Sequence, residues 1–218
     1  MSENVSSPRL KIAAMVSGQG RGSNLGALLV ACESGEIAGR FSVVIGTRAD
    51  APALERARAA GVATSVISPR KYEGNEAGYA EALLRILHRH EVDLLCLAGY
   101  MRQLPPAVVA AYAERILNVH PALLPLFGGR GMYGENVHRA VIESGMKVSG
   151  CTVHFVDEHY DTGPIVVQIA VPVEEADTPA ALAARVITAE HQAYVRAVHL
   201  CAAGRVHVEG RRVRISTV

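Results

Sequence analysis

Short apolar runs alternate with helical patterns through the first half of the chain, and this alternation restricts the possible folds more than any other feature. Strands are predicted at 10–17, 41–47, 62–68 and 93–99, and helices between them at 23–35, 51–61 and 74–90. Runs that are apolar on both faces suit parallel strands covered by helices on both sides, with right-handed crossovers. The sequence therefore predicts an α/β fold with a mostly parallel, twisted sheet and a Rossmann-like N-terminal half.

The pattern changes after residue 118. A glycine-rich loop at 125–136 and a short helix near 136–144 precede two strands, at 148–156 and 164–173, whose short link predicts a hairpin. A long helix follows at 178–204, and two short strands flank Glu209–Gly210–Arg211. We therefore expect antiparallel strands toward the C-terminus.

The chain has 218 residues, of which 50% are hydrophobic and 20% charged, as in an ordinary globular domain. We expect a flexible tail at 1–8 and a single domain over 9–218, with one lobe over about 9–115 and a second over about 116–218. The net charge of +1 indicates no nucleic-acid partner, and no apolar run is long enough to predict a membrane partner. The N-terminus lacks a secretory signal, and the four cysteines lack C-x-x-C spacing, which favours reduced thiols in a cytoplasmic protein.

The stretch SGQGRGSN at 17–24 follows the first predicted strand. Its glycines let backbone N–H groups approach an anion, and the next helix, capped by Ser23 or Asn24, favours negative charge at its N-terminus. It is no P-loop, because no Gly-Lys-Ser/Thr follows, and Ser23 replaces the third glycine of the dinucleotide fingerprint. We expect a cradle for one phosphate, with a tight turn that binds nothing as the alternative.

Asn118 and His120 lie at the end of the apolar run ILNVH. Residues two apart in a strand share a face, and ligands of open α/β sheets bind at the carboxyl ends of strands. An amide donor beside an imidazole suits stabilisation of an oxyanion together with acid–base chemistry. The alternative is a polar pair that is satisfied beneath a loop.

The turn at 157–161 contains three acids, Asp157, Glu158 and Asp161. Such acids usually form turns or face solvent, but one that faced His120 would hold the imidazole and raise its pKa. A metal site is the rival interpretation, yet His154 and His159 are five apart across a turn, so we expect no metal.

Two further segments are ambiguous when taken alone. After a buried strand, Met101 and Leu104 would offer an apolar wall and Arg102 an anion contact. The simpler interpretation is a strand end that turns into a helix, with Arg102 on the surface. Glu190 and His191 lie on the long helix, and their spacing alone indicates a solvated or interface pair.

Taken together, these pieces resemble the phosphoribosylglycinamide formyltransferases, the folate-dependent enzymes of purine synthesis. The resemblance covers about residues 10–205. Its most specific parts are two motifs. The first is Asn118-Val119-His120-Pro121 followed by LLP, and the second is HFV around His154 followed by the D-x-G-P that begins at Asp161. The glycine loop and the 125–136 loop are longer than in many members, and Arg70 or Lys71 could replace an arginine that some members direct at folate.

The resemblance implies a formyl transfer from 10-formyltetrahydrofolate, as cosubstrate, to the amine of glycinamide ribonucleotide by direct attack, in a monomer or homodimer without a metal. It implies a catalytic trio of Asn118, His120 and Asp161. It implies substrate contacts from Gly22, Ser23, Asn24 and Glu190. The folate pocket that it implies consists of Met101, Arg102, Gln103, Leu104, Asn118, Asp157, Glu158, His159, Tyr160 and Asp161.

Four other functions fit parts of the pattern. Methionyl-tRNA formyltransferases share the N-x-H and D core but carry an RNA-binding domain, and formyltetrahydrofolate deformylases add an N-terminal regulatory domain. A non-catalytic nucleotide- or folate-binding module could use the same scaffold. A dinucleotide-dependent oxidoreductase would need the missing third glycine.

Overall fold

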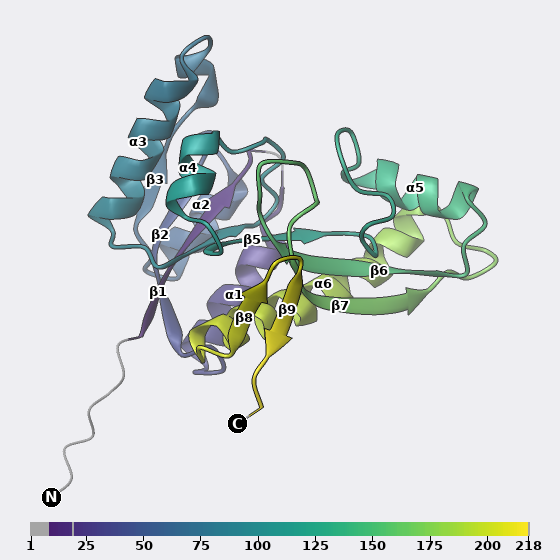
Figure 1. Cartoon of the computed structure of the whole chain (residues 1–218). Coiled ribbons are helices and arrows are strands. Elements are labelled where there is room, and N and C mark those ends of the chain that lie inside the picture. The colour runs from purple at the N-terminus through teal and green to yellow at the C-terminus, as the bar shows by residue number, and fades with distance from the viewer. Residues whose placement is uncertain (1–8, 19, 218) are drawn as a thin grey trace, which may run out of the picture.

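A seven-stranded sheet forms the centre of the molecule, with strand order β3-β2-β1-β4-β5-β6-β7 (Figure 1). The computed structural model describes residues 9–18 and 20–217, so the tail predicted at 1–8 lies outside the described residues. The parallel strands are β1 (Leu10–Val16), β2 (Gly39–Gly46), β3 (Thr64–Val66), β4 (Leu94–Leu97) and β5 (Ile116–His120). The antiparallel strands are β6 (Val148–Phe155) and β7 (Ile165–Pro172). The α/β class predicted from the sequence is confirmed.

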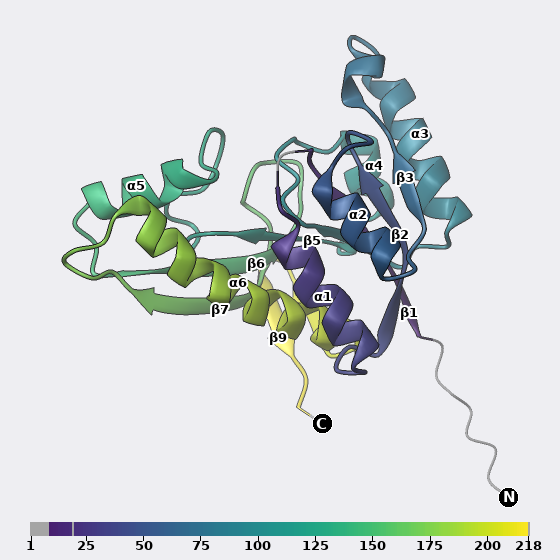
Figure 2. The ribbon, with the colours of Figure 1, turned by 180° about the vertical axis from the view of Figure 1, so that it is seen from behind.

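Helices cover both faces of this sheet, as predicted. The helices are α1 (Ser23–Glu33), α2 (Pro52–Ala59), α3 (Glu76–Arg89), α4 (Pro106–Ala111), α5 (Glu135–Glu143) and α6 (Pro179–Ala202). Successive strand residues point to opposite faces, so Ile12, Ala14 and Val16 of β1 pack toward α1, α2 and α6, whereas Ala13 and Met15 pack toward α3 and α4. Figures 1 and 2 show these two faces in turn.

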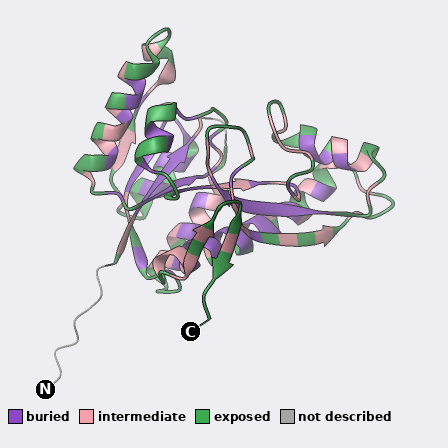
Figure 3. Cartoon of the chain, viewed as in Figure 1, coloured by how far each residue is buried: buried purple, intermediate pink, exposed green. Residues whose placement is uncertain are grey.

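Burial follows the same pattern (Figure 3). Every residue of β4 is buried, because helices cover both of its faces, whereas β7 alternates along most of its length between exposed and partly buried residues. A separate hairpin of β8 (Val206–Glu209) and β9 (Arg212–Ile215) forms the two terminal strands that the sequence predicts.

Strand direction reverses between β5 and β6, and this reversal positions polar side chains together. Asn118 pairs with His154, and His120 pairs with Thr152. Directly opposed residues of an antiparallel pair project to the same face, so all four side chains share one face. Leu117 and Val119 project to the other face and join the core beneath α6. The polar face is covered by loops, which leaves room for a ligand.

Some local predictions need correction. Neither Ser23 nor Asn24 caps α1, because the N-cap is Gly22 and no side-chain cap bond occurs there among the described residues. The strand predicted at 62–68 is limited to Thr64–Val66, since Pro69 begins a 3₁₀ turn, η1 (Pro69–Tyr72). None of the described helices combines the length and the apolar character that a membrane crossing would require.

All four cysteines are free thiols. Burial raises the pKa of Cys32 to about 11. Burial, with smaller effects from neighbouring groups, raises the pKa of Cys151 to about 12. It likewise raises the pKa of Cys201 to about 12 and the pKa of Cys96. These thiols therefore stay protonated at neutral pH.

Candidate active site

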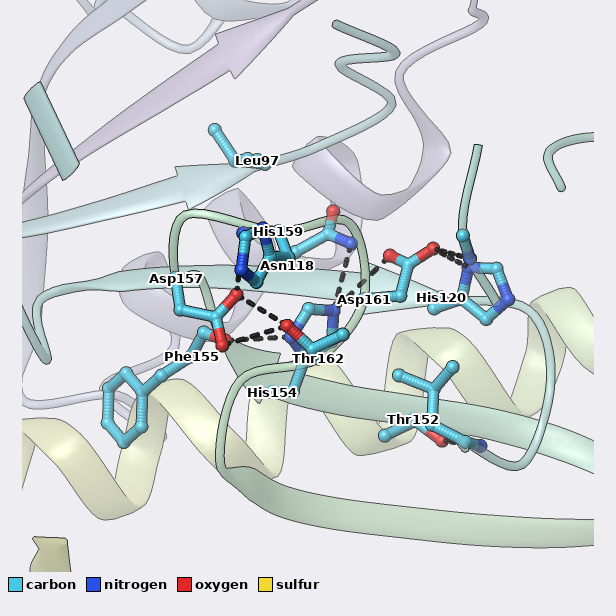
Figure 4. Close-up of polar contacts among 12 residues, drawn as sticks. Leu97, Asn118, His120, Thr152, His154, Phe155, Asp157, His159, Asp161 and Thr162 are labelled. Carbon is cyan, nitrogen blue, oxygen red and sulfur yellow. Dashed lines mark hydrogen bonds and ion pairs between the residues drawn. The ribbon is translucent and has the colours of Figure 1, made fainter. Parts of the chain in front are cut away.

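A cleft of about 940 Å³ lies at the carboxyl ends of β4 and β5, above the polar face of β5 and β6. Its walls come from the loops after β1, β4, β5 and β6, from the first turn of α5 and from one face of α6. Asn118, His120, His154 and Asp161 lie along its floor, as the close-up in Figure 4 shows. The carboxyl edge of an open α/β sheet is where ligands of such folds bind.

His120 is buried, with 3% of its surface exposed, and both of its ring nitrogens have neighbours. Nε2 lies 2.8 Å from the carbonyl oxygen of Phe127, to which it must donate, and Nδ1 lies 3.5 Å from Oδ2 of Asp161. Burial lowers the pKa of His120, and this effect outweighs the opposing influence of the Asp161 carboxylate. The sequence predicted that an acid facing His120 would raise its pKa, and Asp161 has that effect; the net pKa is nevertheless lowered, because desolvation is the larger influence.

Asp161 connects three groups around the centre of the cleft. Its Oδ2 accepts a hydrogen bond from the Gly129 backbone N–H at 2.8 Å, and its Oδ1 lies 3.6 Å from Nε2 of His154. Burial alone would raise the pKa of Asp161, but the neighbouring His154, the charge of His120 and the Gly129 N–H together hold it below its usual value. The carboxylate is therefore charged at neutral pH and faces both imidazoles.

Asn118 and His154 form the second half of the cluster. His154 Nδ1 donates to the Phe155 carbonyl at 2.7 Å, so in the neutral ring Nε2 carries the lone pair and accepts from Asn118 Nδ2 at 3.2 Å. One N–H of the Asn118 amide remains for a ligand. The sequence did not place His154 in the trio, because its position opposite Asn118 depends on the pairing of β5 with β6 across a long connection.

The glycine loop meets α6 at the other end of the cleft. Gly22 has φ +68, and a Cβ on it would lie 2.8 Å from Cβ of Ala53, so only glycine fits there without strain. Asn24 donates from Nδ2 to Oε2 of Glu190 at 2.7 Å. Of this loop, Arg21 and Asn24 line the cleft, whereas Gly22 and Ser23 do not line it.

Glu190 is buried, with 8% of its surface exposed. Burial raises its pKa to about 7, although the hydrogen bond from Asn24 opposes the rise. Spacing alone predicted a solvated or interface position; the solvated alternative is wrong, because Glu190 lies on the face of α6 that packs toward α1.

The remaining predicted residues gather at the β4 end of the cleft. Met101, Arg102, Gln103 and Leu104 all line it. Gln103 donates from its backbone N–H to the Tyr160 hydroxyl at 3.1 Å and from Nε2 to the Glu158 carbonyl at 2.6 Å, which joins this segment to the 157–161 turn.

Within that turn, Asp157, His159 and Tyr160 line the cleft, and Glu158 does not. Asp157 accepts from the His159 backbone N–H at 3.0 Å and from the Thr162 hydroxyl, so its carboxylate shapes the turn. A second hollow of about 760 Å³ adjoins the cleft and contains Arg70 and Arg102.

Sequence reasoning missed several cleft residues: Arg21, Arg130, Tyr133, His138 and an apolar stripe on α6 of Ala180, Ala183, Ala184 and Ile187. The stripe follows helical spacing, which by itself indicates core, since periodicity cannot distinguish a buried face from a cleft wall. Across residues 9–18 and 20–217, no group of three His, Cys, Asp or Glu side chains is arranged to hold a metal ion.

Comparison with known proteins agrees with this geometry. The model of the formyl transferase family matches residues 10–198. The phosphoribosylglycinamide formyltransferase of Escherichia coli K12 is 39% identical over 197 residues, covering 90% of this chain and 89% of that protein. The chloroplastic phosphoribosylglycinamide formyltransferase of Arabidopsis thaliana is 43% identical over 190 residues, and this chain spans only 64% of its length.

The solved structures give the same result. Glycinamide ribonucleotide transformylase 1 from Symbiobacterium toebii superposes with a TM-score of 0.89 at 46% identity, covering 96% of this chain and 95% of that chain. The resemblance drawn from the N-x-H-P and D-x-G-P motifs is confirmed by these similarities. The chain belongs to the formyl transferase family.

Proposed function

We propose that the protein transfers the formyl group of 10-formyltetrahydrofolate to the amine of glycinamide ribonucleotide in purine biosynthesis. The observation that carries this proposal is the position of Asn118, His120, His154 and Asp161 in the middle of one cleft, with a different chemical environment at each end. Both sequence relatives described above are phosphoribosylglycinamide formyltransferases.

The β4 end suits the folate. Leu104 and Val156 offer apolar surface, Met101 is half exposed, and the backbone of the 157–161 turn offers polar groups to a flat heteroaromatic ring. The adjoining hollow contains Arg70 and Arg102, which complement the carboxylates of a folate tail. Lys71, the other basic residue considered for this role, does not line either hollow.

The α1–α6 end suits the ribonucleotide. The first-turn N–H groups of α1 and the exposed guanidinium of Arg21 favour a phosphate. Glu190 has one carboxylate oxygen on Asn24 and offers the other to the hydroxyl donors of a ribose. The substrate amine would then reach the Asn118–His120 floor.

The chemistry requires no protein nucleophile. The amine lone pair attacks the formyl carbon to give a tetrahedral intermediate, and the free N–H of Asn118 stabilises its oxyanion. The C–N bond to the folate nitrogen then breaks, that nitrogen takes a proton, and the former amine loses one. His120 suits the transfer of this proton, directly or through water, because a proton on its Nδ1 would face the Asp161 carboxylate.

The contacts of His120 in the free protein must change before it can take part in this mechanism. Its Nε2 donates to the Phe127 carbonyl, and its Nδ1 faces Asp161, so neither nitrogen faces a reacting group directly. We infer that a bound substrate or water replaces the Phe127 carbonyl at Nε2. The imidazole would then lie between the carboxylate that orients it and the substrate that it protonates or deprotonates.

The decisive experiment measures formyl transfer from 10-formyltetrahydrofolate to glycinamide ribonucleotide by the wild-type protein and by His120→Ala and Asn118→Ala. Loss of one oxyanion donor typically lowers kcat by about 10² to 10³. We expect that loss for Asn118→Ala, and a loss of about 10² to 10⁴ for His120→Ala, which removes the acid–base group, with unchanged unfolding midpoints. Asn136→Ala, in the exposed start of α5, serves as the control. Near-wild-type turnover of Asn118→Ala would rule out its role.

Hydrolysis of the formyl group is the competing activity of this scaffold. Formate release measured with and without glycinamide ribonucleotide separates transfer from hydrolysis, and we expect release without the acceptor to be negligible. The assignment to a monomer or homodimer and to the cytoplasm stays a prediction.

A further inference from the structure

His138 is a buried histidine in the cleft wall for which neither the sequence nor the mechanism gives a use. It lies in the first turn of α5, only 4% of its surface is exposed, and it lines the cleft. Its Nδ1 is enclosed and has no hydrogen-bond partner in the part of the chain that the structure describes. Enclosing an unpaired ring nitrogen opposes folding, so packing alone does not explain why a histidine is present.

The surroundings of His138 favour an uncharged ring. Burial lowers its pKa, the nearby His120 lowers it further, and Glu135 on the same helix opposes these effects. A neutral imidazole carries one proton, on one of its two nitrogens. Because Nδ1 is enclosed, Nε2 is the nitrogen that can meet a ligand, and with the proton there it offers a single donor.

The connections of α5 place His138 at the ribonucleotide end of the cleft. In the β5–β6 pairing, Asn118 lies opposite His154, close to the 157–161 turn, whereas His120 lies opposite Thr152, closer to the start of β6. Helix α5 leads into that start and packs against α6, whose cleft-facing stripe continues to Glu190. Figure 2 shows α5 beside the first turns of α6.

The order of chemical groups along glycinamide ribonucleotide indicates which of them lies beside His138. Phosphate, ribose, amide and amine follow one another in glycinamide ribonucleotide. In the function proposed above, α1 takes the phosphate, Glu190 the ribose, and Asn118 with His120 the amine. The amide between ribose and amine has no assigned partner, and an uncharged donor such as a neutral imidazole suits an uncharged carbonyl oxygen.

We propose that His138 is a specificity-determining residue that donates a hydrogen bond from Nε2 to the glycinamide carbonyl of the acceptor. This inference rests on the proposed function. The contact holds the arm that carries the attacking amine, so it discriminates the ribonucleotide from amines that lack the carbonyl. A buried polar group left unpaired by such an analogue penalises its binding.

The test compares His138→Leu with the wild-type protein, varying each substrate in turn. Loss of one such hydrogen bond raises the KM for glycinamide ribonucleotide by about tenfold, with the KM for the folate unchanged. The unfolding midpoint stays the same or rises, because the enclosed nitrogen has been removed. A purely structural role would instead lower the midpoint and leave both KM values unchanged.

His191→Leu is the matched control. His191 also has an enclosed nitrogen without a partner among residues 9–18 and 20–217, it lies next to Glu190 on α6, and it does not line the cleft. The same change there leaves both KM values unchanged. His138→Gln retains a donor near the position of Nε2, and we expect it to keep the acceptor KM within about threefold of wild type.

An unchanged acceptor KM in His138→Leu, or equal increases in both KM values, would overturn the proposal. If the leucine variant does not fold, the comparison of His138→Gln with His138→Met decides in the same way. Calorimetric binding of glycinamide ribonucleotide gives the comparison without turnover. If the wild-type protein binds the ribonucleotide but transfers no formyl group, the proposed function is wrong. The binding measurements on the His138 variants then test the His138 contact by themselves.

Discussion

His120 experiences opposing influences within a few ångströms. Burial disfavours its charged form, whereas the Asp161 carboxylate, 3.5 Å from Nδ1, favours that form. Burial prevails, so the free imidazole is neutral at pH 7 and available to accept a proton. A proton taken during turnover would arrive beside a carboxylate that is already charged.

Asp161→Asn tests this balance at the level of one residue. Asparagine can still accept from the Gly129 N–H, but it no longer favours a proton on His120. The pKa of His120 should fall further, so the acidic limb of the pH–rate profile should move to lower pH. Turnover should fall about tenfold or more. An unmoved limb in profiles of kcat/KM would show that His120 does not control it.

Residue-level predictions from the sequence succeeded where geometry is local. The i, i+2 rule placed Asn118 and His120 on one face, and the register confirms it. The neighbours of His154 could not be predicted from the sequence, because they depend on the pairing of two strands separated by a long connection. The burial of Glu190 depends on the packing of α6 against α1, which helical periodicity does not contain.

Among the connecting elements, the loop between β5 and α5 links the centre of the site to its cover. Its Phe127 carbonyl accepts from His120, and its Gly129 N–H donates to Asp161. The buried Thr152 hydroxyl anchors the start of this loop by donating to the Ala122 carbonyl and accepting from the Leu124 N–H. The loop therefore acts on both catalytic candidates at once.

Gly129→Ala tests this connection. Gly129 has φ +97, which alanine adopts only with strain, so the backbone should shift and weaken the bond to Asp161. We expect turnover to fall several-fold, as for the loss of about one hydrogen bond, with a small loss of stability. Gly131→Ala is the control, since Gly131 has φ +89 and equal space but is not bonded to Asp161. Equal losses in both variants, measured as kcat beside unfolding midpoints, would refute the connection.

Most elements were predictable because their signals are strong and local. The long α6 and the β6–β7 hairpin follow from periodicity and link length. The short η1 turn was missed, because Pro69 marks a change of chain direction without specifying the next element. The helix expected after the strand end at 98–104 is present as α4, although its bounds were not predicted from the sequence. The shape of the 125–136 loop depends on contacts with Thr152 and Asp161, so its sequence alone does not determine it.

For the whole molecule, the buried Glu190 links function to folding stability. Its pKa in the folded protein is about 7, above the ordinary glutamate value of 4.5. An acid with a raised pKa contributes stability below its unfolded pKa, and that stability is lost as pH rises through the folded value. The wild-type protein should therefore lose stability between about pH 4.5 and pH 7 because of this group.

Glu190→Gln removes this dependence. The variant should be more stable than the wild type at pH 8 by about 1–3 kcal/mol, with little difference near pH 4. Its acceptor KM should rise, because the charged oxygen that suits the ribose hydroxyls is gone. Denaturant unfolding of both proteins across this pH range provides the measurement. Parallel curves at all pH values would mean that Glu190 has an ordinary pKa in the folded protein.

The protonated thiols have a practical consequence for following the protein in solution. Reagents such as maleimides react with thiolates, and burial keeps Cys32, Cys151 and Cys201 at pKa values of about 11 to 12. A cysteine introduced at the exposed Tyr133 would therefore be alkylated far faster than the native ones. One fluorophore could report on the mouth of the cleft without first deleting any natural cysteine.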